Sequence, residues 1–295
     1  MDRKQSEEWQ SKVSRTVNSI ACFSLAYVIL TYMLWVAMGV AGKIFRFDSF
    51  IYYYGITFIL NTHAWSATKV ATVYSAGPVI ILLLALAGIF CFNKIKKIKS
   101  ILNLFFMWLF IVGISIFLSQ FIIAALGIYH YHSIYYQGLA VSFAWLKLPV
   151  WAVVLLNITG LLLAVYIGVN CARPFLSFSY SYSKVNSHAR RRKYFFEIAL
   201  APYILGSLIT IIAVFPKEIA AKNVLLLLAS THFIYIAVIG IILGIGYLSL
   251  AYLEVSKGEL LRYKSLQTPS IITLITMVIV WAYIYITLRG IYFVS

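Results

Sequence analysis

The chain has 295 residues, of which 63% are hydrophobic and only 11% are charged. A soluble domain of this length carries about a quarter charged residues, so the composition excludes an ordinary soluble globular protein. The formal net charge is +16. The cations flank apolar runs and do not form a stripe with RNA-type aromatic motifs, so we expect no nucleic-acid partner.

Seven apolar runs are long enough to cross a bilayer, for which about 20 residues suffice. They predict an all-α, multi-pass helix bundle in a single transmembrane domain, 17–289. A polar segment, 1–16, precedes it at the cytoplasmic surface, and an external tail, 290–295, follows it. The expected spans are 17–41, 70–92, 101–127, 149–171, 194–214, 224–253 and 270–288.

Two basic clusters lie in loops between predicted spans and fix the expected orientation. Their residues are Lys94, Lys96, Lys97, Lys99, Arg190, Arg191, Arg192 and Lys193. Short basic loops stay in the cytoplasm, because moving each cation across a bilayer costs several kcal/mol. With both clusters inside, 17 of the 24 Lys and Arg residues fall on the cytoplasmic side. We predict a cytoplasmic N-terminus, an external C-terminus, and contact of both clusters with anionic lipids or a partner.

Two aromatic-rich stretches, 49–65 and 128–147, fall on the expected outer side. The apolar part of the first is too short to span, and dense Tyr and Trp favour the membrane–water boundary, so we expect interfacial or re-entrant elements. Both stretches contain the pattern I-Y-Y-x-G followed by Ala-Trp. This similarity leaves two interpretations open, a tandem duplication of a hairpin or two independent aromatic belts.

The candidate ligand-binding side chains are the imidazoles, aromatic rings and the lysine expected near the outer face. They are Tyr53, His63, Trp65, Lys69, His130, His132, Tyr135, Trp145 and His232. Imidazoles gathered on one side of a membrane can hold haem or a transition metal. No helix carries an H-x-x-x-H face, and no carboxylate stands nearby to orient a ring. We therefore predict no cofactor, with haem or a metal as the alternative.

Several smaller features concern packing between helices. The pair Gly240 and Gly244 forms a G-x-x-x-G motif, which predicts close contact with another helix, more often one of the same bundle than a second copy. Polar residues within spans, such as Gln120, are expected to bridge helices. Glu197 is expected at the cytoplasmic end of its span, and Pro202 lies within that span.

No carboxylate falls in the middle of a predicted span, whereas ion-coupled carriers and many transferases use one. The motifs H-E-x-x-H and G-x-S-x-G are also missing from the sequence. This pattern favours a non-catalytic subunit or scaffold of a membrane complex, acting through its aromatic outer surface and basic cytoplasmic loops. The alternative is an enzyme or carrier for a lipid-linked or hydrophobic substrate at the outer face. We expect a plasma-membrane location, in a bacterial inner membrane, with bilayer lipids and either a membrane-protein partner or a second copy as partners.

Overall fold

Six long apolar helices identify the chain as an integral, multi-pass membrane protein. They are found within the part of the chain that the computed structural model describes, and their bounds are Trp9–Ile44, Ala67–Ile95, Ile101–Gly127, Val150–Ser177, His188–Ile211 and Thr231–Ser249. The described residues are 3–52, 55–58, 65–95, 100–128, 137–214, 222–256, 258, 260, 266, 271, 274–275, 277–278, 281–282 and 291–293. The predicted seventh span, 270–288, falls mostly outside them, and the total of seven spans stays a prediction.

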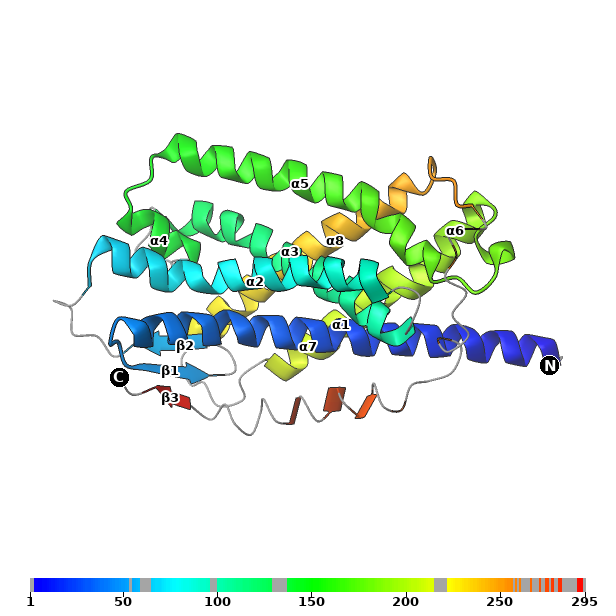
Figure 1. Ribbon diagram of the computed structural model, residues 1–295, viewed down its shortest axis with the longest axis horizontal. Coiled ribbons are helices and arrows are strands. Elements are labelled where there is room, and N and C mark those ends of the chain that lie inside the picture. The colour runs from blue at the N-terminus through cyan, green and yellow to red at the C-terminus, as the bar shows by residue number, and fades with distance from the viewer. Residues whose placement is uncertain are drawn as a thin grey trace.

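The helices run up and down along one common direction (Figure 1). The long ones are α1 (Arg3–Ile44), α2 (Ala67–Ile95), α3 (Ser100–Gly127), α5 (Val150–Ser177), α7 (Ala201–Val214) and α8 (Lys222–Ser249). One end of the bundle carries α6 (His188–Phe195) and is called the basic end below. The opposite end carries a small sheet and is called the sheet end (Figure 1). The basic end corresponds to the side expected in the cytoplasm, and the orientation in a membrane stays a prediction.

Helix α1 runs without a break from Arg3 to Ile44. The described part of the polar segment 1–16 therefore forms the first turns of the spanning helix and is not a separate surface helix. The physical reason is that no proline or glycine interrupts the chain before Gly39. Burial begins at Ser14 and Arg15, so the last polar turn of this segment already contacts the bundle.

The described part of the first aromatic stretch contains two strands, so the expectation of a purely helical chain was incomplete. Strands β1 (Ser49–Tyr52), β2 (Gly55–Phe58) and β3 (Ile291–Phe293) pair antiparallel in the order β2-β1-β3. The predicted external tail thus contributes an edge strand at residues 291–293. Ile51 and Phe58 face α1 at Gly39 and Gly42, where a Cβ atom would lie 2.6 Å from either side chain. Alternating burial in a short segment rich in Ile, Phe and Tyr is the pattern of a strand.

The second aromatic stretch ends in a short helix, α4 (Leu139–Trp145), at the sheet end. Leu139 and Ala140 pack against Ala124 of α3, and the Ser142 hydroxyl donates to the Ala71 carbonyl of α2 at 3.2 Å. Gly138 precedes the helix at φ 52°, a conformation that favours glycine. The described parts of the two I-Y-Y-x-G stretches therefore differ, since one lies in strands and the other precedes a helix.

The cluster Arg190–Lys193 was predicted in a loop, and that prediction is wrong. It lies within α6, whose first turn is capped by the Ser187 hydroxyl, which accepts from the Arg190 N–H at 3.4 Å. Helix α6 continues through a π-helical segment, η3 (Phe196–Leu200), into α7. A serine cap and a following apolar stripe are sufficient to begin the helix among the cations.

Helices α5 and α8 make close contact near the basic end through glycines. A Cβ atom on Gly168 would lie 2.9 Å from the Ile242 carbonyl oxygen, and one on Gly246 would lie 3.0 Å from the Gly168 carbonyl oxygen. Gly240 instead lies against Tyr203 of α7, while Gly244 has nothing within 4 Å. The glycines of the G-x-x-x-G region thus serve two internal helices, and Gly244 takes no part in the packing.

The crowded surroundings of Gly168 and the open surroundings of Gly244 allow a matched pair of substitutions. Gly168→Ala should lower the free energy of unfolding by about 1–3 kcal/mol, because the added methyl group meets backbone and must push α5 from α8. Gly244→Ala should be neutral or stabilising by up to about 1 kcal/mol, since alanine favours the helix and the space is open. Thermal denaturation of the purified protein in mild detergent measures both. Equal effects of the two changes would contradict the described α5–α8 contact.

Candidate functional site

A polar joint between α1 and the η3–α7 region is the most extensive polar contact at the basic end. Its origin is Pro202, which has no N–H and cannot bond the Ile198 carbonyl in an α-helix or the Glu197 carbonyl in a π-helix. The Ala201 N–H bonds the Phe196 carbonyl. The missing Pro202 N–H is therefore the helical donor that either the Glu197 or the Ile198 carbonyl of η3 would use.

Hydroxyl groups of α1 bond both carbonyls. Thr16 Oγ1 donates to the Glu197 carbonyl at 3.0 Å, and Ser19 Oγ donates to the Ile198 carbonyl at 2.6 Å. Ser19 Oγ also accepts from Trp108 Nε1 at 2.8 Å, and both residues are fully buried. One serine hydroxyl thus connects three elements, α1, α3 and η3.

A buried ion pair lies beside these hydroxyls, because Arg15 directly precedes Thr16 and is one turn of α1 from Ser19. Arg15 Nη2 donates to Glu197 Oε2 at 2.9 Å, and the two side chains are only 6% and 7% exposed. Lys12 approaches the other carboxylate oxygen at 3.5 Å from a half-exposed position. The Arg15 guanidinium also lies over the Tyr194 ring, 5.5 Å from its centroid. Glu197 was not among the predicted site residues, and its signal in the sequence was a carboxylate five residues before a proline within a span.

His232 lies inside the bundle and is 9% exposed, between α1 and α8. Its Nδ1 shares a hydrogen bond of 2.6 Å with the Tyr27 hydroxyl. Gln120 Nε2 of α3 donates to the Tyr235 hydroxyl at 2.8 Å, and the His232 and Tyr235 rings meet edge to face at 5.8 Å. His232, a predicted ligand-binding residue, thus lies where it joins α8 to α1. Such bridging between helices was expected of polar residues within spans, for example Gln120.

Trp65 and Lys69 lie in an aromatic cluster at the sheet end. Trp65 stacks on Phe47 with ring centroids 4.0 Å apart and meets the edge of Phe58 at 5.6 Å. The Lys69 ammonium lies 5.7 Å from the centroid of the Phe47 ring. These rings pack on one another and fix the sheet to the start of α2, so they join elements of the chain.

Trp145 is 41% exposed at the end of α4 and lies in neither of these two clusters. The remaining candidates lie outside the described residues, and their predicted roles stay predictions. They are Tyr53, His63, His130, His132 and Tyr135, together with Lys96, Lys97 and Lys99. In the part of the chain that is described, no three or more His, Cys, Asp or Glu side chains come together as metal ligands would.

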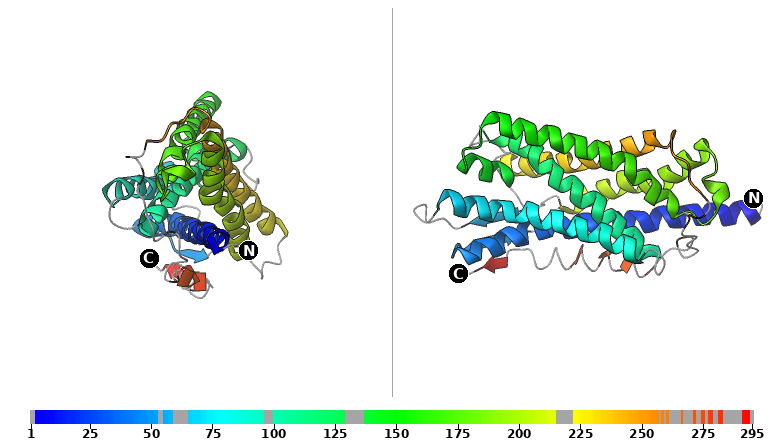
Figure 2. Two further views of the ribbon diagram at one scale, coloured as in Figure 1. Left: turned by 90° about the vertical axis from the view of Figure 1, so that its right-hand side faces the viewer. Right: turned by 45° about the horizontal axis from the view of Figure 1, so that its top comes forward.

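The outer face of α5 carries an exposed stripe, and α5 lies at the edge of the bundle away from α1 (Figures 1 and 2). The stripe follows helical spacing and mixes apolar with hydrogen-bonding side chains. Its members are Leu155, Thr159, Leu162, Tyr166, Asn170 and Arg173. Tyr166 is 68% exposed near the centre of the helix. Among the candidate spans of the described chain, α5 has the smallest buried share.

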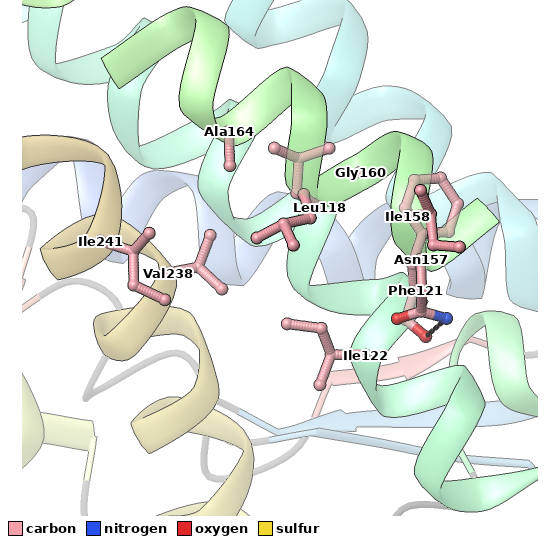
Figure 3. A pocket seen from close by; sticks show the side chains of 10 residues that line it. Leu118, Phe121, Ile122, Asn157, Ile158, Gly160, Ala164, Val238 and Ile241 are labelled. Carbon is pink, nitrogen blue, oxygen red and sulfur yellow. Dashed lines mark hydrogen bonds between the residues drawn. The ribbon is translucent and has the colours of Figure 1, made fainter. Parts of the chain in front are cut away.

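A groove of about 310 Å³ lies between α3, α5 and α8 (Figure 3). On α5 the groove is formed by the small residues Gly160 and Ala164, which fill little space. Val238 and Ile241 form its wall on α8. Asn157 is the polar residue of the lining, and its amide donates to the Phe121 carbonyl at 3.1 Å and the Val153 carbonyl at 2.9 Å. The walls are otherwise apolar.

Comparisons with protein-family models, curated proteins and solved structures give no match for this chain.

The buried ion pair is open to direct test. Glu197→Gln should lower the free energy of unfolding by about 3–5 kcal/mol, because it leaves the buried Arg15 charge without its partner. Adding Arg15→Met should restore part of that loss, since both charges are then removed. Glu254→Gln, at an exposed position, is the matched control and should change stability by less than about 0.5 kcal/mol. If Glu197→Gln had no larger effect than Glu254→Gln, the pair would not be structural.

Proposed function

We propose that the chain is a non-catalytic subunit or scaffold of a membrane complex and that the α5 stripe receives a transmembrane helix of a different chain. The observation that carries the proposal is the set of hydrogen-bonding side chains exposed within a membrane-spanning helix. Thr159 and Tyr166 flank the centre of the 28-residue α5. Tyrosine favours the boundary of a bilayer, and polar side chains within a span usually face another helix.

The hydrogen bonds of the stripe support this interpretation. Thr159 Oγ1 donates to the Leu155 carbonyl and Asn170 Nδ2 donates to the Tyr166 carbonyl, each at or below 2.9 Å. Each side chain retains acceptor capacity, since an amide oxygen and a hydroxyl oxygen accept independently of their donors. A neighbouring helix with donors at matching positions would use that capacity and the Tyr166 hydroxyl.

Charge favours a different chain over a second copy as the occupant. The basic end carries Lys94, Arg173 and Lys184 as well as the cluster Arg190–Lys193. A second copy in the same orientation would bring two strongly cationic ends side by side, which is unfavourable. A helix with a carboxylate at its cytoplasmic end would instead complement this charge.

The placement of the other polar residues also supports a scaffold. Glu197 bonds Arg15, His232 bonds Tyr27, and Lys69 lies over Phe47. Each of these groups, which an enzyme could use in acid–base chemistry, is already engaged in joining elements of the chain. The proposal places the protein in a plasma membrane, the bacterial inner membrane.

A carrier or enzyme for a lipid-linked or hydrophobic substrate is the second candidate. The groove between α3, α5 and α8 favours it, because a slot of this size with apolar walls suits a hydrocarbon chain. Binding of haem or a metal by the outer histidines would be part of this second candidate function. Full cellular function after His63, His130, His132 and the buried His232 are all changed to alanine would remove it.

Crosslinking tests the partner helix. A photoreactive residue at Tyr166 should give an adduct with one defined membrane protein, mapped to a transmembrane helix with an acidic residue near its cytoplasmic end. The same residue at Phe90, which is exposed on α2, should give lipid adducts only. Tyr166→Leu combined with Asn170→Leu should reduce the co-purified partner about tenfold, as the loss of two hydrogen bonds within a membrane predicts.

Two outcomes would overturn the proposal. Lipid adducts alone at Tyr166 would mean that α5 faces the bilayer, and an adduct between two copies of the chain would replace the different partner by a homo-oligomer.

A further inference from the structure

The four cations of α6 are not equivalent. Arg190 and Lys193 are exposed, whereas Arg191 and Arg192 are half-buried, as is His188. Positions 188, 191 and 192 are separated by three and four residues, so they share one face of the helix. The cluster therefore has an outward pair and an inward set of three residues.

The inward set holds enclosed nitrogen atoms without partners. Arg191 Nε, Arg192 Nε and His188 Nε2 are shielded from solvent and have no hydrogen-bond partner among the described residues. Arg190 differs, since its Nη1 donates to the Ser183 carbonyl at 2.8 Å and to Asn186 Oδ1 at 3.2 Å. Enclosed N–H donors normally have acceptors, so this set needs one from outside the described contacts.

The described residues around this set supply no acceptor of the required charge. The Arg192 guanidinium lies over the Tyr247 ring of α8 at 5.2 Å, which offers a ring face. Glu197, one turn further along, is occupied by Arg15 and Lys12. Among the described residues, no carboxylate forms an ion pair with Arg191 or Arg192. The hydroxyl of Tyr194, two residues after Arg192 and 3% exposed, also has no hydrogen-bond partner in the described part of the chain.

We propose that His188, Arg191 and Arg192 form a binding site for a phosphate group, supplied by the head group of an anionic phospholipid. The Nε–H and one Nη–H of an arginine form a planar fork that matches two phosphate oxygens, and two such forks are adjacent here. The site lies at the end of the bundle expected at the anionic cytoplasmic leaflet, where such head groups are concentrated. Free phosphate has the same chemistry and is the other source. The site does not depend on the proposed partner helix at α5.

The test compares two pairs of substitutions that remove the same charge. Arg191→Gln with Arg192→Gln removes the inward pair, and Arg190→Gln with Lys193→Gln removes the outward pair. Phosphatidylglycerol is titrated into the purified protein against a phosphatidylcholine background, and bound lipid is counted by native mass spectrometry. Retention should fall about tenfold or more for the inward pair, through loss of charge-assisted hydrogen bonds, and less than about threefold for the outward pair.

A third variant distinguishes the geometry of the arginine side chains from their charge, and two further measurements show whether each variant is folded. Arg191→Lys with Arg192→Lys keeps both charges and removes both forks, so it should also lose most of the bound lipid. A single monodisperse peak and an unchanged melting temperature show that a variant is folded. Inorganic phosphate that raises the melting temperature of the wild type but not of the inward variants, without selective lipid retention, would assign the site to free phosphate. Equal loss in the inward and outward pairs, or retention by the inward variants, would overturn the site.

Discussion

The bundle depends on the bonding of two carbonyl groups, those of Glu197 and Ile198, beside Pro202, which lacks the N–H that either of them would use in a helix. In a membrane such groups have no water to bond, and each one left open costs several kcal/mol. Thr16 and Ser19 of α1 bond them, and Arg15 holds the neighbouring Glu197 carboxylate. Because hydroxyl groups must meet particular carbonyls, the joint fixes both the depth and the rotation of α1 against α7.

Helix α1 carries this constraint to the rest of the chain. Tyr27 meets His232 of α8 in the middle of the bundle, while Gly39 and Gly42 receive the sheet at its far end. Trp108 extends the joint to α3. Helix α5 has no such tie to α1 and lies at the edge, joined through small residues to α8 and through Asn157 to α3. Helix α1 therefore contributes mainly to the stability of the bundle, whereas the exposed face of α5 is free to associate with another helix, as proposed above.

The sequence was sufficient for local features and insufficient for distant contacts. Long apolar runs predict helices well because any membrane span must bond its own backbone, and five of the expected spans match α1, α2, α3, α5 and α8 within a few residues or as parts of longer helices. The run Arg190–Lys193 misled, since charge predicts exposure but not the loss of helical structure.

The pairing of β1 with β3 and of Arg15 with Glu197 joins residues about 240 and 182 positions apart, and no local pattern specifies such partners. Of the predicted ligand-binding residues that are described, His232, Trp65 and Lys69 make packing contacts within the chain, and their role in ligand binding stays a prediction.

The joint at Pro202 can be tested by measuring how two substitutions couple. Ser19→Ala should lower the free energy of unfolding by about 1–3 kcal/mol in the wild type, since it leaves the Ile198 carbonyl without a donor. In a Pro202→Ala background the new N–H can bond that carbonyl, so the same Ser19→Ala change should cost at least about 1 kcal/mol less. The remaining cost would be that of Trp108 Nε1, which also bonds Ser19. An equal cost of Ser19→Ala in both backgrounds would contradict the account, because the hydroxyl would then not be replacing the missing proline donor.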